Sequence, residues 1–570
     1  MTHYVAIDNK NFYKFINKKY AKYKIPAKQK SLKQICFPKK YEFQIPQKFL
    51  ADFINPNTPY KSLLIYHRIG AGKTCTAINI AENFKKSKKI IIVLPASLKG
   101  NFRSELRSLC TGEKYLTNAE RNQLKIFHPS TAEYKEIIKQ TDKRIDKYYT
   151  IYSYNKFVDL IKQKKMNLDN CLVIIDEIHN MISETGTYYE FLYKAIHSAP
   201  NNMRLVIMSA TPIFDKPIEI ALTMNLLLRD KQLPIGKNFI NTFMDITYTD
   251  KGPTYQVKNM DLFKDYVKGY VSYYRGAPPH VFPETKLYQV RIKMSDQQAK
   301  LYQKILSQES KNNPIADYVN TDISNSFFIG TRMVSNFYYP NGKLGEKGYT
   351  SLIEEDFDTD RIKIYSPKFY RILRKIRSAE GTVFVYSSFK EYGGIKTFVR
   401  LLEHHRYKNY ENHGPGRKRF AIWSGDQDLM AKEEIKAVFN NINNVDGSQI
   451  KVILGSPSIK EGVSFLRVQQ VHIMEPYWNL SRIHQIMGRA IRFCSHKDMP
   501  KEKQLVKVYI YIAVHSNIAI SIDEYIMRMA IVKQSINKTF ETALKEAAID
   551  CELFKNANVY PGEEDIQCEI

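Results

Sequence analysis

Cysteine is scarce in this sequence, and its spacing argues against two kinds of stabilising centre. The 570 residues contain seven cysteines and no pair spaced as CxxC. An odd number without that spacing argues against a disulfide framework and against a structural zinc site. We therefore expect free thiols, as in a protein of a reducing compartment. The cysteines are Cys36, Cys75, Cys110, Cys171, Cys494, Cys551 and Cys568.

Long apolar segments are missing as well. Residues 1–30 contain no apolar core of the kind that a secretory signal requires. The longest apolar runs, such as Ile90–Pro95 and Leu172–Ile175, are far shorter than the ~20 residues that cross a bilayer. We therefore expect a soluble intracellular protein in which these runs form buried strands.

Acidic residues are too few to balance the basic ones. The chain has 86 Lys and Arg against 58 Asp and Glu, a formal net charge of +28. Such a surplus favours a polyanionic partner, because phosphates that a protein neutralises release their condensed counterions. The alternative is a Lys-rich composition that reflects only an AT-rich genome. With 44% hydrophobic residues the chain can bury a large core, and its length predicts two to four domains.

The basic surplus begins at the N-terminus. Residues 1–50 hold twelve lysines against Asp8 and Glu42, so residues 1–45 are interpreted as a basic extension. Two alternatives remain open: an arm that binds nucleic acid or an acidic partner, and a solvated leader before the first lobe. The aromatic residues interleaved with the lysines are Tyr4, Phe12, Tyr13, Tyr20 and Tyr23.

From about residue 60 to 225, short apolar runs alternate with amphipathic helical stretches. Each run is rich in β-branched residues and ends in a turn or a charged residue. This pattern is typical of a parallel sheet covered by helices on both faces, so residues 46–229 are expected to form an α/β lobe. The predicted strands are Ser62–Tyr66, Lys89–Pro95, Tyr149–Ser153, Cys171–Asp176 and Arg204–Met208.

A second series of the same kind predicts a second α/β lobe over residues 371–515. Between the lobes, residues 230–370 show weaker periodicity, and we expect a mostly helical insertion there. Residues 516–570 are expected to form a C-terminal extension, with one amphipathic helix over Asp523–Ala548 and an acidic tail. The predicted strands of the second lobe are Gly381–Tyr386, Phe420–Trp423, Gln449–Leu454, Gln470–Met474 and Val506–Ile512.

A glycine-rich loop, His67–Thr74, follows the first predicted strand. Its glycines let the backbone curl so that successive N–H groups face the β- and γ-phosphates, and the next helix adds its N-terminal dipole. Lys73 brings a positive charge to the terminal phosphates, and the Thr74 hydroxyl is placed to hold Mg²⁺. Because His67 stands where the strict pattern has glycine, this is the shorter GxGKT form. The expected phosphate-binding residues are Gly70, Ala71, Gly72, Lys73 and Thr74.

An acidic pair ends the fourth predicted strand. Asp176 and Glu177 follow an apolar run, where carboxylates are costly unless they meet a cation. We expect Asp176 to hold Mg²⁺ through water and Glu177 to orient and deprotonate the attacking water. His179 is expected to couple this site to the other motifs. The alternative is an ordinary acidic loop after a core strand.

Two small hydroxyl residues, Ser209 and Thr211, lie just past the fifth predicted strand. Such side chains can hydrogen-bond the acidic site, so we expect them to link hydrolysis to movement of the lobes. A plain strand-to-loop turn is the alternative.

The second lobe contains a QxxGRxxR pattern formed by Gln485, Gly488, Arg489 and Arg492. The two arginines are three residues apart, a spacing that places them on one face of a helix. We expect both to neutralise charge that develops on the γ-phosphate, as arginine fingers do. A basic surface helix is the alternative, although it does not require Gln485 or Gly488.

These motifs together resemble superfamily 2 helicases and translocases, of DExH and Swi/Snf type, over roughly residues 45–515. The resemblance implies two tandem RecA-like lobes, ATP and Mg²⁺ as ligands, and a nucleic-acid track, DNA rather than RNA. Gln47 resembles the glutamine that reads adenine in this group. Ser97 and Asn101 lie in a stretch similar to a Swi/Snf motif that meets the nucleic-acid backbone. Glu461 and Gly462 lie in a stretch that resembles the fifth motif of this group, which links the DNA-binding residues to the ATP-binding residues.

A narrower resemblance is to the ATPases of large cytoplasmic DNA viruses, represented by the early transcription factor small subunit and nucleoside triphosphate phosphohydrolase I. It implies a viral RNA polymerase as partner, at initiation or at termination, and a place in the host cytoplasm, at the virus factory, and in the virion. The segments that carry it are Thr58–Tyr60, Asp176–Asn180, Gly269–Tyr274, Pro283, Glu475–Asn479, Gln485–Arg492, Ser495–His496 and Asp550–Leu553.

Three functions therefore stay open. The first is a DNA-dependent ATPase that translocates along DNA in early viral transcription. The second is a strand-separating DNA helicase of replication or repair. The third is a binding module that has lost catalysis, against which Lys73, Glu177 and Arg489 argue, because decay would usually alter one of them.

Overall fold

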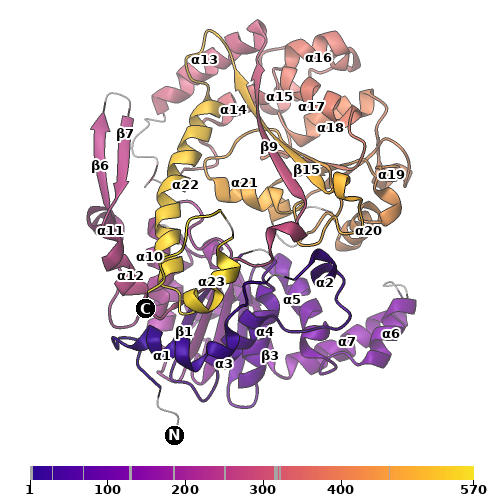
Figure 1. The fold of residues 1–570 in the computed structure, drawn as a ribbon. Helices are drawn as coiled ribbons and strands as arrows, with labels where there is room; N and C mark the ends of the chain where they lie inside the picture. The colour runs from indigo at the N-terminus through magenta and orange to yellow at the C-terminus, as the bar shows by residue number, and fades with distance from the viewer. Residues whose placement is uncertain are drawn as a thin grey trace. The chain divides into compact units, whose positions relative to one another are not determined.

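The computed structural model divides the chain into two compact units (Figure 1). Unit 1 comprises Met1–Pro278 and Ser535–Ile570, and unit 2 comprises Pro279–Gln534. The structure describes all residues except 1–3, 29, 69, 128–130, 184–185, 250–251, 313–318, 320–322, 426, 461–462, 561 and 570.

Unit 1 is built on a six-stranded parallel sheet with the strand order β3-β2-β4-β5-β1-β8. The five predicted strands are confirmed. Four of them are apolar runs buried along nearly their whole length, as a sheet covered by helices requires, whereas Tyr149–Ser153 at the sheet edge is only partly buried. The strands are β1 (Ser62–His67), β2 (Lys89–Leu94), β3 (Tyr149–Ser153), β4 (Cys171–Asp176), β5 (Arg204–Ser209) and β8 (Val271–Tyr274). The helices are α1 (Phe12–Lys19), α2 (Leu32–Cys36), α3 (Ile45–Phe53), α4 (Lys73–Phe84), α5 (Lys99–Leu106), α6 (Asn118–Ile126), α7 (Ala132–Asp146), α8 (Tyr154–Lys162), α9 (Tyr189–His197), α10 (Ile218–Leu227), α11 (Gly236–Phe243), α12 (Met260–Val267) and α23 (Cys551–Asn558).

Unit 2 is built on a seven-stranded parallel sheet with the order β11-β12-β13-β10-β14-β15-β9. Its five predicted strands are also confirmed. The strands are β9 (Glu284–Lys293), β10 (Val383–Tyr386), β11 (Lys408–Asn409), β12 (Arg419–Trp423), β13 (Val452–Gly455), β14 (Gln470–Ile473) and β15 (Leu505–Val514). The helices are α13 (Asp296–Asn312), α14 (Ile329–Asn336), α15 (Gly345–Tyr349), α16 (Thr359–Tyr365), α17 (Pro367–Arg377), α18 (Ile395–His404), α19 (Tyr410–His413), α20 (Leu429–Phe439) and α21 (Leu480–Met487).

The predicted C-terminal helix is confirmed as α22 (Ile522–Glu546), whose residues belong partly to each unit. Residues 230–370, for which a mostly helical insertion was predicted, also contain four strands. Two of them form the antiparallel hairpin of β6 (Met244–Thr249) and β7 (Gly252–Val257), while β8 joins the first sheet and β9 the second. Sequence periodicity missed β9 because it is an exposed edge strand without an apolar run, and β8 because it has only four residues.

The basic N-terminal segment contributes aromatic residues to the core of unit 1. Phe12, Tyr13 and Tyr20 are buried and pack with Phe49, Phe53 and Tyr60. These side chains therefore belong neither to an arm that binds nucleic acid nor to a solvated leader, the two alternatives considered for this segment. Aromatic burial outweighs the local lysine content here because each ring removes far more apolar surface from water than a lysine stem.

The expectation of free thiols is wrong for six of the seven cysteines, which are disulfide-bonded. Two of the bonded pairs lie within unit 1. Cys75 is bonded to Cys110, with their Cα atoms 5.9 Å apart, and Cys551 is bonded to Cys568, with their Cα atoms 5.6 Å apart. Both Cα separations lie in the range that a disulfide requires. Cys171 is a buried free cysteine, as expected. Spacing along the chain did not reveal these pairs because folding brings together residues 35 and 17 positions apart.

Reduction of these disulfides is expected to destabilise unit 1. Loop closure over 35 and 17 residues predicts about 3 to 4 kcal/mol for each crosslink. Adding dithiothreitol should lower the urea midpoint of the wild-type protein, and it should lower the midpoint of a variant with Ser at Cys75, Cys110, Cys551 and Cys568 by much less. Cys171→Ser serves as the control, because it should keep the response to reductant. Free thiols at all four positions in peptide mapping of the non-reduced protein would contradict the prediction.

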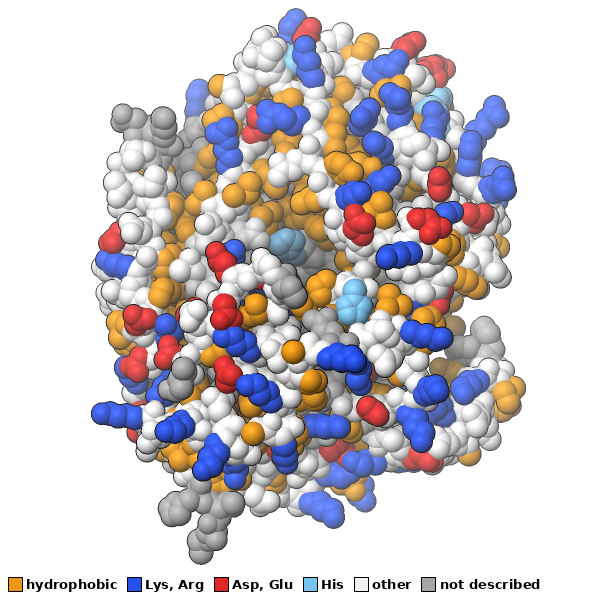
Figure 2. Space-filling view, in the orientation of Figure 1, with side chains coloured by type: hydrophobic (Ala, Val, Ile, Leu, Met, Phe, Trp, Pro, Cys, Tyr) orange, Lys and Arg blue, Asp and Glu red, His pale blue; other side chains and the backbone are white. Residues whose placement is uncertain are grey.

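On the face drawn in Figure 2, Lys and Arg side chains are spread among Asp and Glu side chains and do not gather on one patch. Net charge by itself therefore defines no track for a polyanion on this face. Among the helices that the structure describes, none is both long and apolar enough to cross a membrane.

Candidate active site

The glycine-rich loop connects β1 to α4. Gly70 and Gly72 have φ angles of 86° and 67°, in the left-handed region that favours glycine. A Cβ atom on Gly72 would lie 2.6 Å from Nε2 of Gln47, so a side chain at this position would also clash. The predicted need for both glycines is thus explained by backbone geometry. Residue 69, inside the loop, lies outside the described residues.

Gln47 lies on α3 against this loop. Its side chain is 3% exposed, and its Nε2 donates a hydrogen bond to the carbonyl of Gly72 at 3.2 Å. Its Oε1 accepts from the backbone N–H of Gln44 at 2.8 Å, which fixes the orientation of the amide. The side chain is therefore held at the phosphate loop, and its contact with adenine stays a prediction.

Lys73 and Glu177 form an ion pair at the carboxyl edge of the first sheet. Lys73 begins α4 after β1, and Glu177 follows β4, two strands away in the same parallel sheet. Nζ of Lys73 lies 3.2 Å from Oε1 of Glu177, with the two side chains 13% and 24% exposed. Glu177 has a φ angle of 51°, which directs its backbone away from the line of β4. The structure thus brings together the lysine predicted to bind the phosphates and the glutamate predicted to act as the general base.

Asp176 is buried at the end of β4, and its Oδ1 accepts from the backbone N–H of Glu177 at 2.9 Å. The Tyr154 hydroxyl donates to the backbone carbonyls of Asp176, at 2.5 Å, and Glu177, at 3.0 Å, which holds the acidic turn. The carboxylate of Asp176, at the end of β4, and the hydroxyl of Thr74, in the first turn of α4, are hard oxygen donors at the same edge of the sheet. This donor chemistry is the kind that Mg²⁺ prefers.

The predicted coupling residues also meet in unit 1. Nδ1 of His179 lies 3.4 Å from Oε2 of Glu177 and 3.5 Å from Oγ of Ser209. The backbone N–H of Thr211 donates to the same Ser209 oxygen at 3.0 Å. His179 also stacks on Phe214, with the ring centroids 4.9 Å apart. The acidic turn after β4 is therefore connected through one imidazole to the turn after β5.

The QxxGRxxR residues of unit 2 correct one expectation. Helix α21 ends at Met487, so Arg489 and Arg492 do not project from one helix face. Gly488 ends the helix, and the chain turns there. Nε of Arg489 donates to the carbonyl of Gln485 at 3.2 Å. Arg492 donates from Nε and Nη2 to the Ser464 hydroxyl, at 2.8 and 2.6 Å, so a residue of the fifth-motif stretch fixes its side chain.

The predicted nucleic-acid contacts are only partly described. Ser97 lies on the short helix Ala96–Leu98, Asn101 lies on α5, and both are exposed. Glu461 and Gly462 lie outside the described residues. Trp478, considered as a base-stacking residue, is 3% exposed and stacks on Tyr477, so it packs in the core of unit 2.

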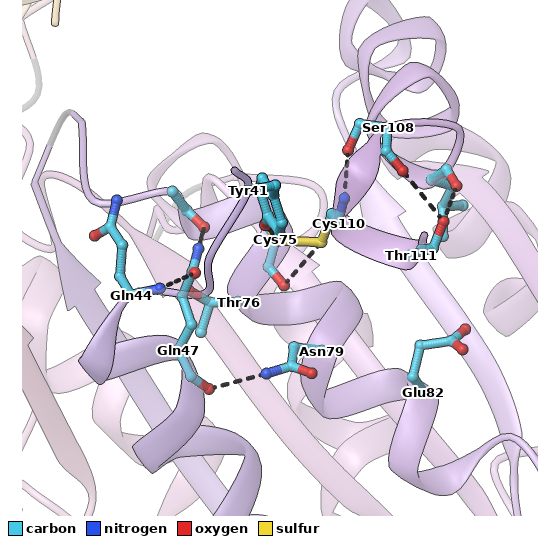
Figure 3. The surroundings of a disulfide bond; sticks show 12 residues. Tyr41, Gln44, Gln47, Cys75, Thr76, Asn79, Glu82, Ser108, Cys110 and Thr111 are labelled. Carbon is cyan, nitrogen blue, oxygen red and sulfur yellow. Dashed lines mark hydrogen bonds between the residues drawn. A yellow bond between two sulfur atoms is a disulfide. The ribbon is translucent and has the colours of Figure 1, made fainter. Parts of the chain in front are cut away.

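Sequence reasoning missed a crosslink beside the phosphate loop. Cys75 follows Thr74 in the first turn of α4, and its disulfide to Cys110 ties this turn to the segment after α5 (Figure 3). The Tyr41 hydroxyl lies 2.9 Å from Sγ of Cys75. The side chain of Tyr41 lies close to the disulfide in Figure 3. The sequence offered no signal for it, because neither cysteine belongs to a motif.

Comparisons with known proteins agree with this geometry. Residues 31–214 match the family described as "Type III restriction enzyme, res subunit", and residues 368–494 match "Helicase conserved C-terminal domain". A protein of Acanthamoeba polyphaga mimivirus named "Putative ATP-dependent RNA helicase R563" is 72% identical over 566 residues, 99% of each chain. An African swine fever virus protein named "Termination factor NPH-I homolog" is 26% identical over 569 residues, 86% of this chain and 76% of its own. The chain therefore belongs to the superfamily 2 ATP-dependent helicases, with two RecA-like lobes and a nucleoside triphosphatase activity.

Proposed function

We propose that this helicase is a DNA-dependent ATPase that translocates along DNA and serves a viral RNA polymerase in early transcription. The observation that carries the motor assignment is the meeting of Lys73, Glu177, His179 and Ser209 in one unit. A degenerate binding module would not need a partly buried, connected set of this kind. The transcription role is supported by the likeness to the viral termination factor homolog.

The first lobe supplies the hydrolytic groups. The backbone amides of Gly70, Ala71 and Gly72 bind the phosphates, and Lys73 exchanges its Glu177 partner for the γ-phosphate when ATP binds. Glu177, released from that ion pair, orients the attacking water and takes its proton. Thr74 and Asp176 would hold Mg²⁺, which neutralises charge on the phosphate oxygens when bound. Gln47, fixed at Gly72, is assigned to the adenine.

The second lobe supplies Arg489 and Arg492. We assign both guanidinium groups to the charge that develops on the γ-phosphate, with Gln485 positioned beside them on α21. Anchoring of Arg492 by Ser464 gives a rigid guanidinium, so little side-chain entropy is lost when it acts.

Coupling to the track is assigned to groups on both lobes. Ser97 and Asn101 are exposed, and we assign them to contact with a phosphate backbone. Glu461 and Gly462 are assigned to the track by their motif. His179, Ser209 and Thr211 transmit the state of Glu177 to the turn after β5. Hydrolysis and movement along the strand are then linked through hydrogen bonds of unit 1.

A second candidate function is an RNA helicase, favoured by the name of the mimivirus relative. A third, strand separation on DNA in replication or repair, would use the same ATPase site. The partners proposed for the first function are DNA and an RNA polymerase, with a place in the host cytoplasm and in the virion.

Strand displacement distinguishes these functions. Purified protein is incubated with ATP and a forked DNA duplex, a forked RNA duplex, or a DNA duplex carrying a third strand. Translocation predicts release of the third strand without separation of either fork. Separation of the RNA fork would favour the RNA helicase, and separation of the DNA fork the replicative helicase. Copurification with the viral RNA polymerase from infected cells is the corresponding test of the transcription role.

A further inference from the structure

The C-terminal segment is bonded to the edge of the sheet that carries the phosphate loop. The backbone N–H of Ile549 donates to the carbonyl of Val271 on β8 at 2.8 Å. The side chain of Asn558 bonds the same strand region twice, accepting from the N–H of Arg275 at 2.9 Å and donating to the carbonyl of Tyr273 at 3.2 Å. Because β8 pairs with β1, this segment lies one strand away from the root of the phosphate loop.

Asp550 reaches from this segment into the interior. Its side chain is fully buried, and burial raises the pKa of its carboxyl to about 7. Oδ2 accepts from the Ser272 hydroxyl at 2.5 Å, and Oδ1 accepts from the backbone N–H of Tyr273 at 2.9 Å. No ion pair to Asp550 occurs among the residues that the structure describes. A buried carboxylate held only by neutral donors is costly, which indicates a role beyond docking of the tail.

Ser272 connects Asp550 to the phosphate loop. Its Oγ lies 2.9 Å from Nε2 of His67, the last residue of β1. With Asp550 ionised, the single hydroxyl proton of Ser272 goes to the carboxylate, so the hydroxyl oxygen accepts from Nε2–H of His67. Burial and the charge of Lys73 lower the pKa of His67 to about 3, so the imidazole is neutral, and the tautomer protonated at Nε2 supplies this donor. The side chain that replaces the usual glycine is therefore fixed by the C-terminal segment.

A second contact reaches the loop itself. Arg68 lies 3.3 Å from Glu541 on α22, and its backbone N–H donates to the carbonyl of Tyr274 at 3.0 Å. The Arg68 side chain is 46% exposed, and exposed ion pairs contribute little. The buried relay through Ser272 is thus the stronger of the two connections between the C-terminal segment and the loop.

We propose that Asp550 is a positioning residue of the ATP site, which acts through Ser272 and His67 to hold the root of the phosphate loop in its binding conformation. When the relay is broken, the loop populates other conformations, and ATP must select the competent one. The apparent affinity for ATP then falls in proportion to the fraction of molecules whose loop is in the binding conformation. The groups that carry out hydrolysis are unchanged once ATP is bound. The signature is a raised KM with an unchanged kcat.

Steady-state ATP hydrolysis by the full-length protein tests this relay. Asp550→Ala and Ser272→Ala are each expected to raise the KM for ATP about tenfold, equivalent to the loss of one buried hydrogen bond, with kcat within twofold of wild type. Asp550→Asn is expected to restore most of the affinity, because its amide accepts from the N–H of Tyr273 and donates to Ser272. Each variant is assayed below its own melting temperature, measured by circular dichroism.

Asn558→Ala is the matched control. It removes two hydrogen bonds from the same segment, one to Tyr273 of β8 and one to Arg275 just after it, but touches neither Ser272 nor His67. Its KM is expected to stay at the wild-type value. Equal increases in KM for Asn558→Ala and Asp550→Ala would overturn the proposal, since general docking of the tail would then explain both. A loss in kcat at unchanged KM for Ser272→Ala would also overturn it, and this variant remains informative if Asp550→Ala does not fold.

Discussion

Replacing Glu177 with glutamine is expected to lower the kcat for ATP hydrolysis about 100-fold or more, the contribution of a positioned general base. Glutamine keeps the size of the side chain and its capacity to accept from Lys73 and His179, but it cannot take a proton from water. ATP binding is expected to persist and to strengthen slightly, because Lys73 no longer forms an ion pair with residue 177. The measurements are steady-state turnover with saturating DNA and direct binding of a fluorescent ATP analogue.

Glu190→Gln is the control for Glu177→Gln. Glu190 lies on α9 of the same unit, where it forms an exposed ion pair with Lys194. This variant should keep the wild-type kcat. If the Glu177→Gln protein keeps more than a few per cent of the wild-type kcat, Glu177 is not the general base. Loss of ATP binding in that variant would instead give Glu177 a part in binding.

Arg489→Ala and Arg492→Ala are each expected to lower kcat about a thousandfold, the low end of what an arginine finger supplies. Lysine at either position should not restore the rate, because an ammonium group cannot reproduce the planar fork of a guanidinium. A lysine at position 492 would also lose the two hydrogen bonds that the guanidinium donates to the Ser464 hydroxyl. ATP affinity, measured with the same fluorescent analogue, should change little, because the ground-state phosphates are held by the first lobe.

Arg417→Ala provides the comparison for these variants, since Arg417 is exposed in the same unit and belongs to no motif. Its kcat should equal that of the wild type. If Arg489→Ala and Arg492→Ala also retain the wild-type kcat, the QxxGRxxR residues serve only the packing of unit 2, and the catalytic assignment fails.

Five strands of each sheet could be predicted from the sequence because parallel strands covered by helices leave continuous apolar runs, whereas β8, β9 and β11 were missed. Ile90–Pro95 and Cys171–Asp176 are examples, and each appears as a strand with almost the same bounds. The same signal is absent from β9, whose residues are mostly exposed at the sheet edge. Runs of apolar residues report burial, so an exposed edge strand cannot be found in this way.

The candidate site was predictable where chemistry restricts the residue type within a short segment. The loop Gly70–Thr74 and the pair Asp176 and Glu177 are such segments, and the structure brings Lys73 and Glu177 to 3.2 Å. The helical placement of Arg489 and Arg492 was wrong, because spacing alone does not show that α21 ends at Met487.

Contacts between distant segments were not predictable. Asp550 and His67 lie far apart in the chain, and the hydrogen bonds through Ser272 are visible only in the fold. The disulfide of Cys75 and Cys110 is a second case, since neither the number nor the spacing of the cysteines indicated it.

The most direct test of the account is ATP hydrolysis by the purified protein without nucleic acid, with single-stranded DNA, with duplex DNA and with RNA, in parallel with Glu177→Gln. The account predicts strong stimulation by DNA, weaker stimulation by RNA, and no stimulated turnover in the variant. Turnover that is equally slow with every nucleic acid would contradict the assignment of this helicase as a DNA-dependent motor.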